Sequence, residues 1–185
     1  MTYNSLDQIF DEIDGTRARL VARYQGLTEA ERSFRPVANA WSADQIVDHL
    51  AVIEGGMIRL INKLLGKAEA AGVAAPGNGS IPPITMEEFN RVADANKFEA
   101  PEPVRPTGTR TGAEALAALE SSRAEIHALR PRLAAVDLSQ VSFPHPFAGP
   151  LNLYQWLVFI GLHEQRHLNQ IERTIPARNG AGVKA

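Results

Sequence analysis

Hydrophobic residues recur at alternating steps of three and four along most of this chain, which is the spacing of one buried face of an α-helix. Four such stripes are present, over residues 6–27, 46–64, 116–136 and 153–171. Charged side chains lie mostly off these lines, so each stripe predicts a long amphipathic helix. No run alternates between apolar and polar residues over more than a few positions, so few strands are expected. The pattern predicts an all-α protein, a four-helix bundle.

Helix starts are marked by a capping box, in which a Ser, Thr or Asn is followed three residues later by Glu or Gln. Thr28 and Thr85 open two short helices in this way, and the second is expected to run toward Phe98. The same signature begins the last three long helices, at Ser42, Thr111 and Asn152. Gly72 marks the end of the second long helix, and Pro131 predicts a kink in the third.

Residues 71–110 differ from the helical segments because they hold six of the twelve prolines, which are Pro76, Pro82, Pro83, Pro101, Pro103 and Pro106. This long crossover between the second and third long helices could travel the length of a bundle. An up-down-down-up order is therefore at least as well supported as up-down-up-down. The shorter connections predict that helices one and two, and helices three and four, are antiparallel neighbours.

The length of 185 residues is typical of one domain with its own hydrophobic core. We expect this domain to cover residues 1–176. Because Pro176 and a glycine-rich stretch follow the last stripe, residues 177–185 are predicted to form a flexible C-terminal tail.

Composition excludes several classes of function. The net charge is −2, which disfavours nucleic acid as a partner. The chain has no cysteine, so it holds no disulfide, no thiolate nucleophile and no cysteine metal ligand. No apolar stretch is long enough to span a membrane, and the first ten residues are acidic and amphipathic, unlike a signal peptide. A protein without membrane association, located in the cytoplasm, is expected.

Two of the five histidines interrupt the apolar stripe of the fourth long helix. His163 and His167 are spaced i and i+4, so both project from one face and their rings can converge on a single ion. His49 lies between Ile46 and Ile53, on the flank of the buried face of another helix. Three neutral imidazoles would form a metal site with an open coordination position, as in catalytic zinc sites.

A structural interpretation stands beside this one. A single histidine on a half-apolar face, such as His49, is more often a hydrogen-bonded core residue than a ligand. Burying two imidazoles without a shared partner is costly, however, and this favours ligation for the pair on the fourth helix. His127 lies beside its stripe and is expected to be exposed. His145 lies between two prolines, where it could be structural, close to the mouth of the site, or without a role.

Residues 163–167 also spell H-E-x-x-H, the motif of zinc proteases in which the glutamate is the general base. Such proteases need a third ligand downstream, but residues 168–173 contain no histidine. The chain also lacks the sheet that these enzymes place over the cleft. Glu164 is therefore expected to be a surface residue or a residue that supports the metal ligands, and not a protease base.

The segments FRPVANAWSADQIVDHLAVIE at 34–54 and HPFAGPLNLYQWLVFIGLHEQRHLNQI at 145–171 resemble the DinB-like superfamily of bacterial metal proteins. That superfamily includes YfiT-like hydrolases, bacillithiol S-transferases and a mycothiol-dependent isomerase. The resemblance implies an up-down-down-up bundle and frequent homodimers. It also implies a divalent metal, zinc or nickel, on His49, His163 and His167.

The leading functional hypothesis is an enzyme whose metal activates a low-molecular-weight thiol, for S-transfer to a small molecule, or water, for hydrolysis. Because the chain has no cysteine, the thiol would be a cosubstrate. The alternative is a non-enzymatic, dimerising metal-binding scaffold, in which a fourth ligand such as Gln45 or Glu54 closes the site. The aromatic residues that could line a pocket, although such residues are more often core, are Trp41, Phe143, Phe147 and Trp156.

Overall fold

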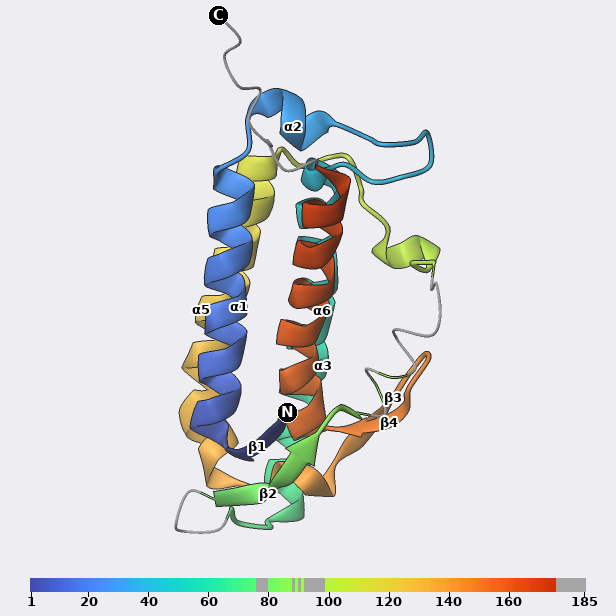
Figure 1. Cartoon of the computed structure of the whole chain (residues 1–185). Coiled ribbons are helices and arrows are strands. Elements are labelled where there is room, and N and C mark those ends of the chain that lie inside the picture. The colour runs from blue at the N-terminus through green and yellow to red at the C-terminus, as the bar shows by residue number, and fades with distance from the viewer. Residues whose placement is uncertain (76–79, 88, 90, 92–98, 176–185) are drawn as a thin grey trace, which may run out of the picture.

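Four long helices dominate the computed structural model, which describes residues 1–75, 80–87, 89, 91 and 99–175 (Figure 1). They are α1 (Leu6–Gln25), α3 (Ala43–Ala71), α5 (Gly112–Ala135) and α6 (Leu153–Thr174). The all-α four-helix bundle predicted from the hydrophobic stripes is confirmed.

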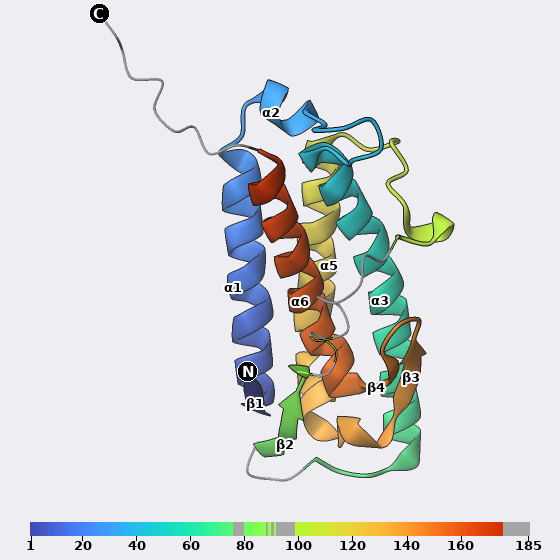
Figure 2. The same ribbon diagram turned by 45° about the vertical axis from the view of Figure 1, so that its right-hand side comes forward.

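The bundle has the up-down-down-up order. Helix α1 rises from the end of the bundle that holds the N-terminus, α3 and α5 both descend, and α6 rises again (Figures 1 and 2). The crossover between α3 and α5 therefore returns along the length of the bundle, as its length allowed.

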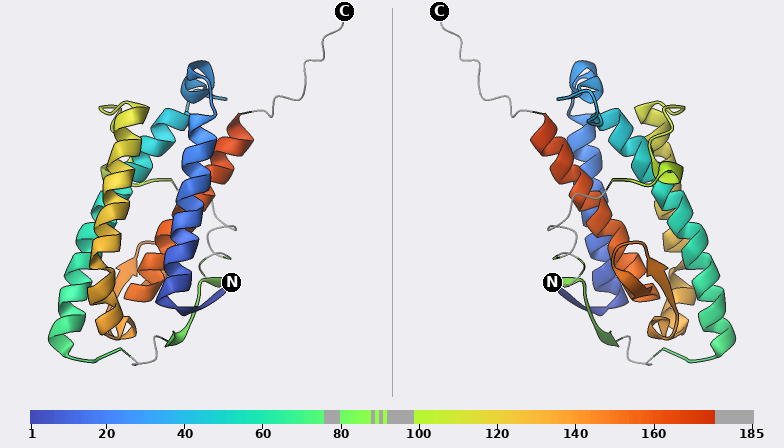
Figure 3. Two further views of the ribbon diagram at one scale, coloured as in Figure 1. Left: turned by 90° about the vertical axis from the view of Figure 1, so that its left-hand side faces the viewer. Right: turned by 90° about the vertical axis from the view of Figure 1, so that its right-hand side faces the viewer.

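The packing of neighbours differs from the prediction. Helix α1 packs mainly on α6, and α3 packs mainly on α5 and then on α6. Figure 3 shows α3 and α5 side by side along most of their length, with α6 inclined to α1. The pairs α1 with α3 and α5 with α6 are antiparallel, but the prediction that they are neighbours is wrong. Residues 26–42 and 136–152, which connect them, are long enough to cross the bundle end diagonally.

The predicted helix starts are confirmed. Ser42, Thr111 and Asn152 each accept a hydrogen bond from the backbone N–H three residues on, in complete capping boxes. Thr28 caps the short helix α2 (Glu29–Ser33) in the same way. Gly72 ends α3 in the left-handed conformation, with a φ of 70°. Helix α5 continues past Pro131 to Ala135. The short helix expected after Thr85 falls mostly outside the described residues, as does the tail.

Two small antiparallel pairs of strands lie toward the end of the bundle that holds the N-terminus (Figure 1). β1 (Thr2–Ser5) pairs with β2 (Ser80–Thr85), and β3 (Ser142–His145) pairs with β4 (Gly149–Asn152). Few strands were expected from the sequence, and residues 142–152, which contain three prolines, were not predicted to form any. Pro144 and Pro150 face each other in the hairpin instead, and Gly149 adopts a φ of 72° that favours glycine.

A layer of charged residues divides the apolar core in two. The buried apolar residues form two clusters, one at the end of the bundle that holds the N-terminus and one at the opposite end. On α1 the first cluster extends to Ile13 and the second begins at Leu20, with Arg17 between them. Each of the other long helices changes cluster in the same way, at Glu54, Arg123 and Glu164. Two 3-10 turns, Glu102–Val104 and Leu138–Gln140, complete the described elements. None of the described helices is long and apolar enough to cross a membrane.

Candidate metal centre

Three imidazoles converge between α3 and α6, at about the level of the charged layer. His49 lies in the second turn of α3, whereas His163 and His167 lie one turn apart on α6. One ring nitrogen of each lies within 4.8 Å of the others, and the Nε2 atoms of His163 and His167 are 3.2 Å apart. The structure thus brings together the three residues that the sequence analysis singled out.

Hydrogen bonds on the far side of two rings orient the site. The Nδ1 atom of His49 lies 2.5 Å from the Val104 carbonyl oxygen, and Nδ1 of His167 lies 2.8 Å from Oε1 of Gln170. Both acceptors require a proton on Nδ1, which leaves a lone pair on each Nε2. A metal ligand needs this tautomer, and proteins commonly fix it through such a partner.

Burial keeps the histidines neutral. Burial and the neighbouring His49 lower the pKa of His167 to about 3. The pKa values of His163 and His49 are lowered too, chiefly by burial. At neutral pH the three rings are therefore unprotonated donors, which is the state that a divalent cation requires.

Aromatic side chains surround the imidazoles. The Trp41 ring lies 4.7 Å from that of His49, and the Phe159 ring stacks on His163 at 5.5 Å. His145 lies 4.8 Å from the Phe159 ring, so it belongs to the wall of the site. Of the three roles left open for His145, the structure supports a place near the mouth.

Asp48, which sequence reasoning missed, fixes the crossover beside His49. Its buried carboxylate accepts hydrogen bonds from the backbone N–H groups of Thr107 and Gly108, at 2.6 and 3.0 Å, and pairs with Arg110 at 3.2 Å. These contacts hold residues 104–110 on α3 and so place the Val104 carbonyl on His49. The available signal was an acidic residue directly before a candidate ligand, on the same buried face.

The three histidines open onto a large cleft of about 1580 Å³. Helices α3 and α6 form its walls, together with the segment 99–105 and the β3–β4 hairpin. Of the four aromatic residues left open between pocket and core, Trp41, Phe147 and Trp156 line it, whereas Phe143 is absent from its lining. The site is thus accessible to a small molecule.

Neither of the suggested fourth ligands reaches the site in a binding pose. The Glu54 carboxylate lies 2.5 Å from the Arg17 guanidinium inside the bundle, and the Gln45 side chain accepts from the Ser42 backbone N–H at 3.1 Å. Within the described part of the chain, the three histidines are the only such group of potential ligands. The donor set is that of an open three-histidine site.

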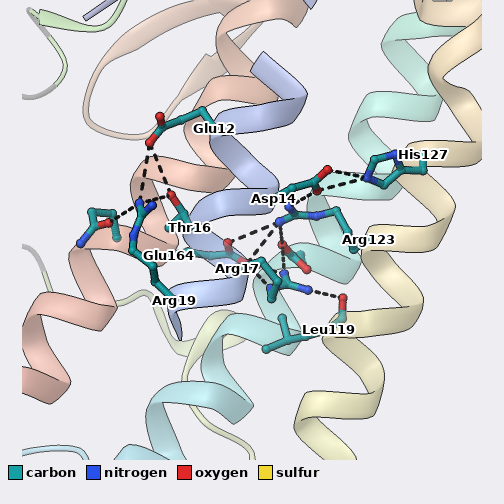
Figure 4. A network of polar contacts seen from close by, with 11 residues as sticks. Glu12, Asp14, Thr16, Arg17, Arg19, Leu119, Arg123, His127 and Glu164 are labelled. Atoms are coloured by element: carbon teal, nitrogen blue, oxygen red, sulfur yellow. Dashed lines mark hydrogen bonds and ion pairs between the residues drawn. The ribbon is translucent and has the colours of Figure 1, made fainter. Parts of the chain in front are cut away.

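Glu164 and His127, for which the sequence analysis also made predictions, belong to one network of polar contacts (Figure 4). Glu164 is buried and accepts from Arg17 Nε at 2.6 Å, so it is neither exposed nor in the cleft. His127 was expected to be exposed, but it is half-buried and lies 3.0 Å from Asp14. Its place beside the stripe turns it toward α1, where Phe10 also contacts it.

Comparisons with known proteins agree with this architecture. The sequence profile of the DinB superfamily matches residues 12–171. The protein YuaE of Bacillus subtilis (strain 168) is 26% identical over 149 residues, which cover 80% of this chain and 85% of YuaE.

Two solved structures share the fold. TT2238, a four-helix bundle protein, aligns with a TM-score of 0.58 and 22% identity, covering 90% of this chain and 98% of its own. YfiT from Bacillus subtilis is described as a probable metal-dependent hydrolase with an unusual four-helix bundle topology. It aligns with a TM-score of 0.57 and 17% identity, covering 90% of this chain and 85% of its own.

Proposed function

Since the chain belongs to the DinB superfamily, we propose that it is a metal-dependent enzyme that binds zinc or nickel through His49, His163 and His167. One observation carries the proposal: three imidazole nitrogens converge at the wall of an open cleft, with no further protein ligand beside them among the described residues. A catalytic site needs such a vacant position for water or substrate, whereas structural sites are closed.

The chemistry fits a small electrophilic substrate. A divalent ion in this site would lower the pKa of a bound water or thiol, giving a nucleophile near neutral pH. Hydrolysis and transfer of a low-molecular-weight thiol both follow from the same donor set. The description of YfiT as a probable metal-dependent hydrolase supports the first. The absence of cysteine makes any thiol a cosubstrate.

The protein's own residues prepare this site. Val104 and Gln170 fix the tautomers of two ligands, and Trp41 and Phe159 cover the imidazole faces and limit the access of water. The homodimer and the cytoplasmic location stay predictions, and sedimentation analysis of the purified protein would test the first.

Metal content provides the first test. We expect about one zinc or nickel ion per chain by elemental analysis, and loss of most of it in His49→Ala, His163→Ala and His167→Ala. His127→Ala, which lies outside the site, should retain the metal. Undiminished metal in the three site variants would refute the proposed site.

Turnover provides the second test. In the thiol assay, the sulfur displaces chloride from monochlorobimane, a carbon–sulfur bond forms, and the thiol proton passes to the buffer. In the hydrolase assay, water cleaves an ester or amide. We expect one of these reactions to depend on both the metal and His163. A metal-loaded protein that catalyses neither would favour the non-enzymatic scaffold.

A further inference from the structure

The charge of the cleft differs from that of the whole chain. Its described lining includes five arginines and a single acidic residue, Glu99, although the protein carries a net charge of −2. The arginines are Arg35, Arg59, Arg105, Arg166 and Arg173. These guanidinium groups give the described lining of the cleft a positive potential that attracts anions.

Four of these arginines lie toward one end. Along α6, the lining residues run from Trp156 and Phe159 to the two histidines, which have Arg166 between them in sequence, and then to Arg173. With a rise of about 1.5 Å per residue, the level of Phe159 lies about 10 Å from that of Arg166. On α6 the apolar end therefore lies on one side of the proposed metal site and Arg173 on the other, with Arg166 at the level of the histidines.

The opposite wall repeats this order. Arg105 follows Val104, whose carbonyl contacts His49, and Arg35 is held near Trp41 by a 2.8 Å hydrogen bond to the Ala40 carbonyl. Farther along α3, the lining becomes apolar with Met57 and Leu60. Arg59, on the same stretch of α3, is the exception.

Two arginines of this end, Arg105 and Arg173, are little neutralised by carboxylates of the described residues. Glu99 approaches Arg105 only to 3.9 Å, and its side chain is 94% exposed. Within the described residues, Arg173 has no ion pair with a carboxylate. Guanidinium groups form paired hydrogen bonds with carboxylate and phosphate groups.

We propose that the cleft binds a two-ended small molecule, with a carboxylate or phosphate at the arginine end and an aromatic or alkyl group against Trp156 and Phe159. In the proposed function, on which this inference builds, the reacting atom lies between the two ends, beside the histidines. The ligand class follows from the lining alone, so binding can be measured without catalysis.

Intrinsic fluorescence provides a direct assay, because the chain has two tryptophans, Trp41 and Trp156, and both line the cleft. The probes are phenylbutyrate, the neutral phenylbutanol and the short anion butyrate. Full-length protein is titrated after removal of metal with a chelator, since a carboxylate would also bind a metal ion directly.

We expect phenylbutyrate to bind about tenfold more tightly than either phenylbutanol or butyrate, because each lacks one of its two ends. Arg166→Gln combined with Arg173→Gln should abolish the preference for the anion. Arg23→Gln combined with Arg132→Gln removes the same charge outside the cleft and should retain it. Equal binding of the acid and the alcohol, or equal loss in both double variants, would overturn the inference.

The two proposals fail separately. If the His163→Ala protein binds no metal and has no activity, but still prefers phenylbutyrate, the ligand inference stands on its own. If the preference appears only in metal-loaded protein, the anion binds the metal and the inference is wrong, while the metal site stands.

Discussion

His163 and Glu164 are consecutive in the chain, but their side chains belong to different environments. His163 faces the cleft with its Nε2 atom 3.2 Å from that of His167, whereas Glu164 is buried against Arg17 inside the bundle (Figure 4). Consecutive helical residues are about 100° apart around the axis. One short stretch of α6 therefore contributes both to the proposed metal site and to the charged layer that divides the core.

Glu164→Gln tests this division of roles. Glu164 accepts from Arg17 and Arg123 at 2.6 and 3.4 Å, and an amide keeps only one of its two acceptor oxygens, so we expect the free energy of unfolding to fall by about 1 kcal/mol. Metal content should be unchanged in the folded protein. Urea unfolding and elemental analysis measure the two effects.

Glu172→Gln is the matched control for this prediction, because Glu172 is exposed on the same helix. It should leave the stability unchanged within about 0.5 kcal/mol. A Glu164→Gln protein of normal stability and metal content, but without activity, would instead restore the protease-like role of Glu164 as a general base.

The sequence predicted the parts of this molecule that depend on local periodicity. A histidine at i and another at i+4 on an apolar stripe must share a face, and His49 lay on the flank of another buried face. Capping boxes located the helix starts for the same reason, since both residues of each box are close in sequence. These signals need no knowledge of how the helices pack.

What the sequence left open depends on contacts between distant segments. The Arg17–Glu164 pair joins residues 147 apart, and Asp48 binds backbone groups about 60 residues away. The β3–β4 hairpin was missed because its prolines obscure the strand pattern and its turn lacks the usual Asn-Gly pair. The cationic end of the cleft is assembled from three segments that are distant in sequence, so no single stretch shows it.

Acid should destabilise the metal-free protein. The pKa of His167 is about 3 in the folded state, well below the ordinary 6.5, so below pH 6.5 the unfolded chain takes up a proton that the native state refuses. The contribution of His167 to the free energy of unfolding is fully present above pH 6.5. It is lost by about 1.4 kcal/mol per pH unit as the pH falls toward 3. His49 and His163 act in the same direction.

Glu164 opposes this trend. Burial and the neighbouring Glu54 raise its pKa to about 7, so between pH 4.5 and 7 the native state holds the extra proton and stability falls as pH rises. Three histidines outweigh one carboxyl, and we expect a net loss on acidification. Urea unfolding of the metal-free protein between pH 5 and 7 measures the slope. His167→Ala should reduce this slope, and His127→Ala should not. Equal slopes in the unchanged protein and both variants would contradict the role of His167 in the acid sensitivity.

Asp48→Asn should weaken the site without removing a ligand. The amide would lose the ion pair with Arg110 and one or more of the backbone hydrogen bonds that hold residues 104–110 beside His49. Because groups that orient a ligand affect metal affinity about 10- to 100-fold, we expect a loss of at least about tenfold. A competition titration with a chelating dye measures this loss.

Asp11→Asn is the control for this substitution. It removes the same charge, and Asp11 is exposed on α1. Both variants should keep the helical circular dichroism of the parent. If Asp48→Asn binds metal as tightly as Asp11→Asn does, the contact between Val104 and His49 does not orient the site.

Removal of the metal distinguishes an enzyme from a scaffold. The two apolar clusters and the charged layer involve all four long helices without any contribution from the imidazoles, so chelation should leave the helical content intact. Since a bound ion stabilises the native state by mass action, the metal-loaded protein should unfold at higher temperature, by about 4 kcal/mol of added stability at a thousandfold excess over Kd. Thermal unfolding followed by circular dichroism, with and without chelator, measures both effects.

Cooperative unfolding in chelator is the result expected for an open, catalytic site. A chain that loses its helices in chelator would mean that the ion holds the bundle together, which is the behaviour of a structural metal site.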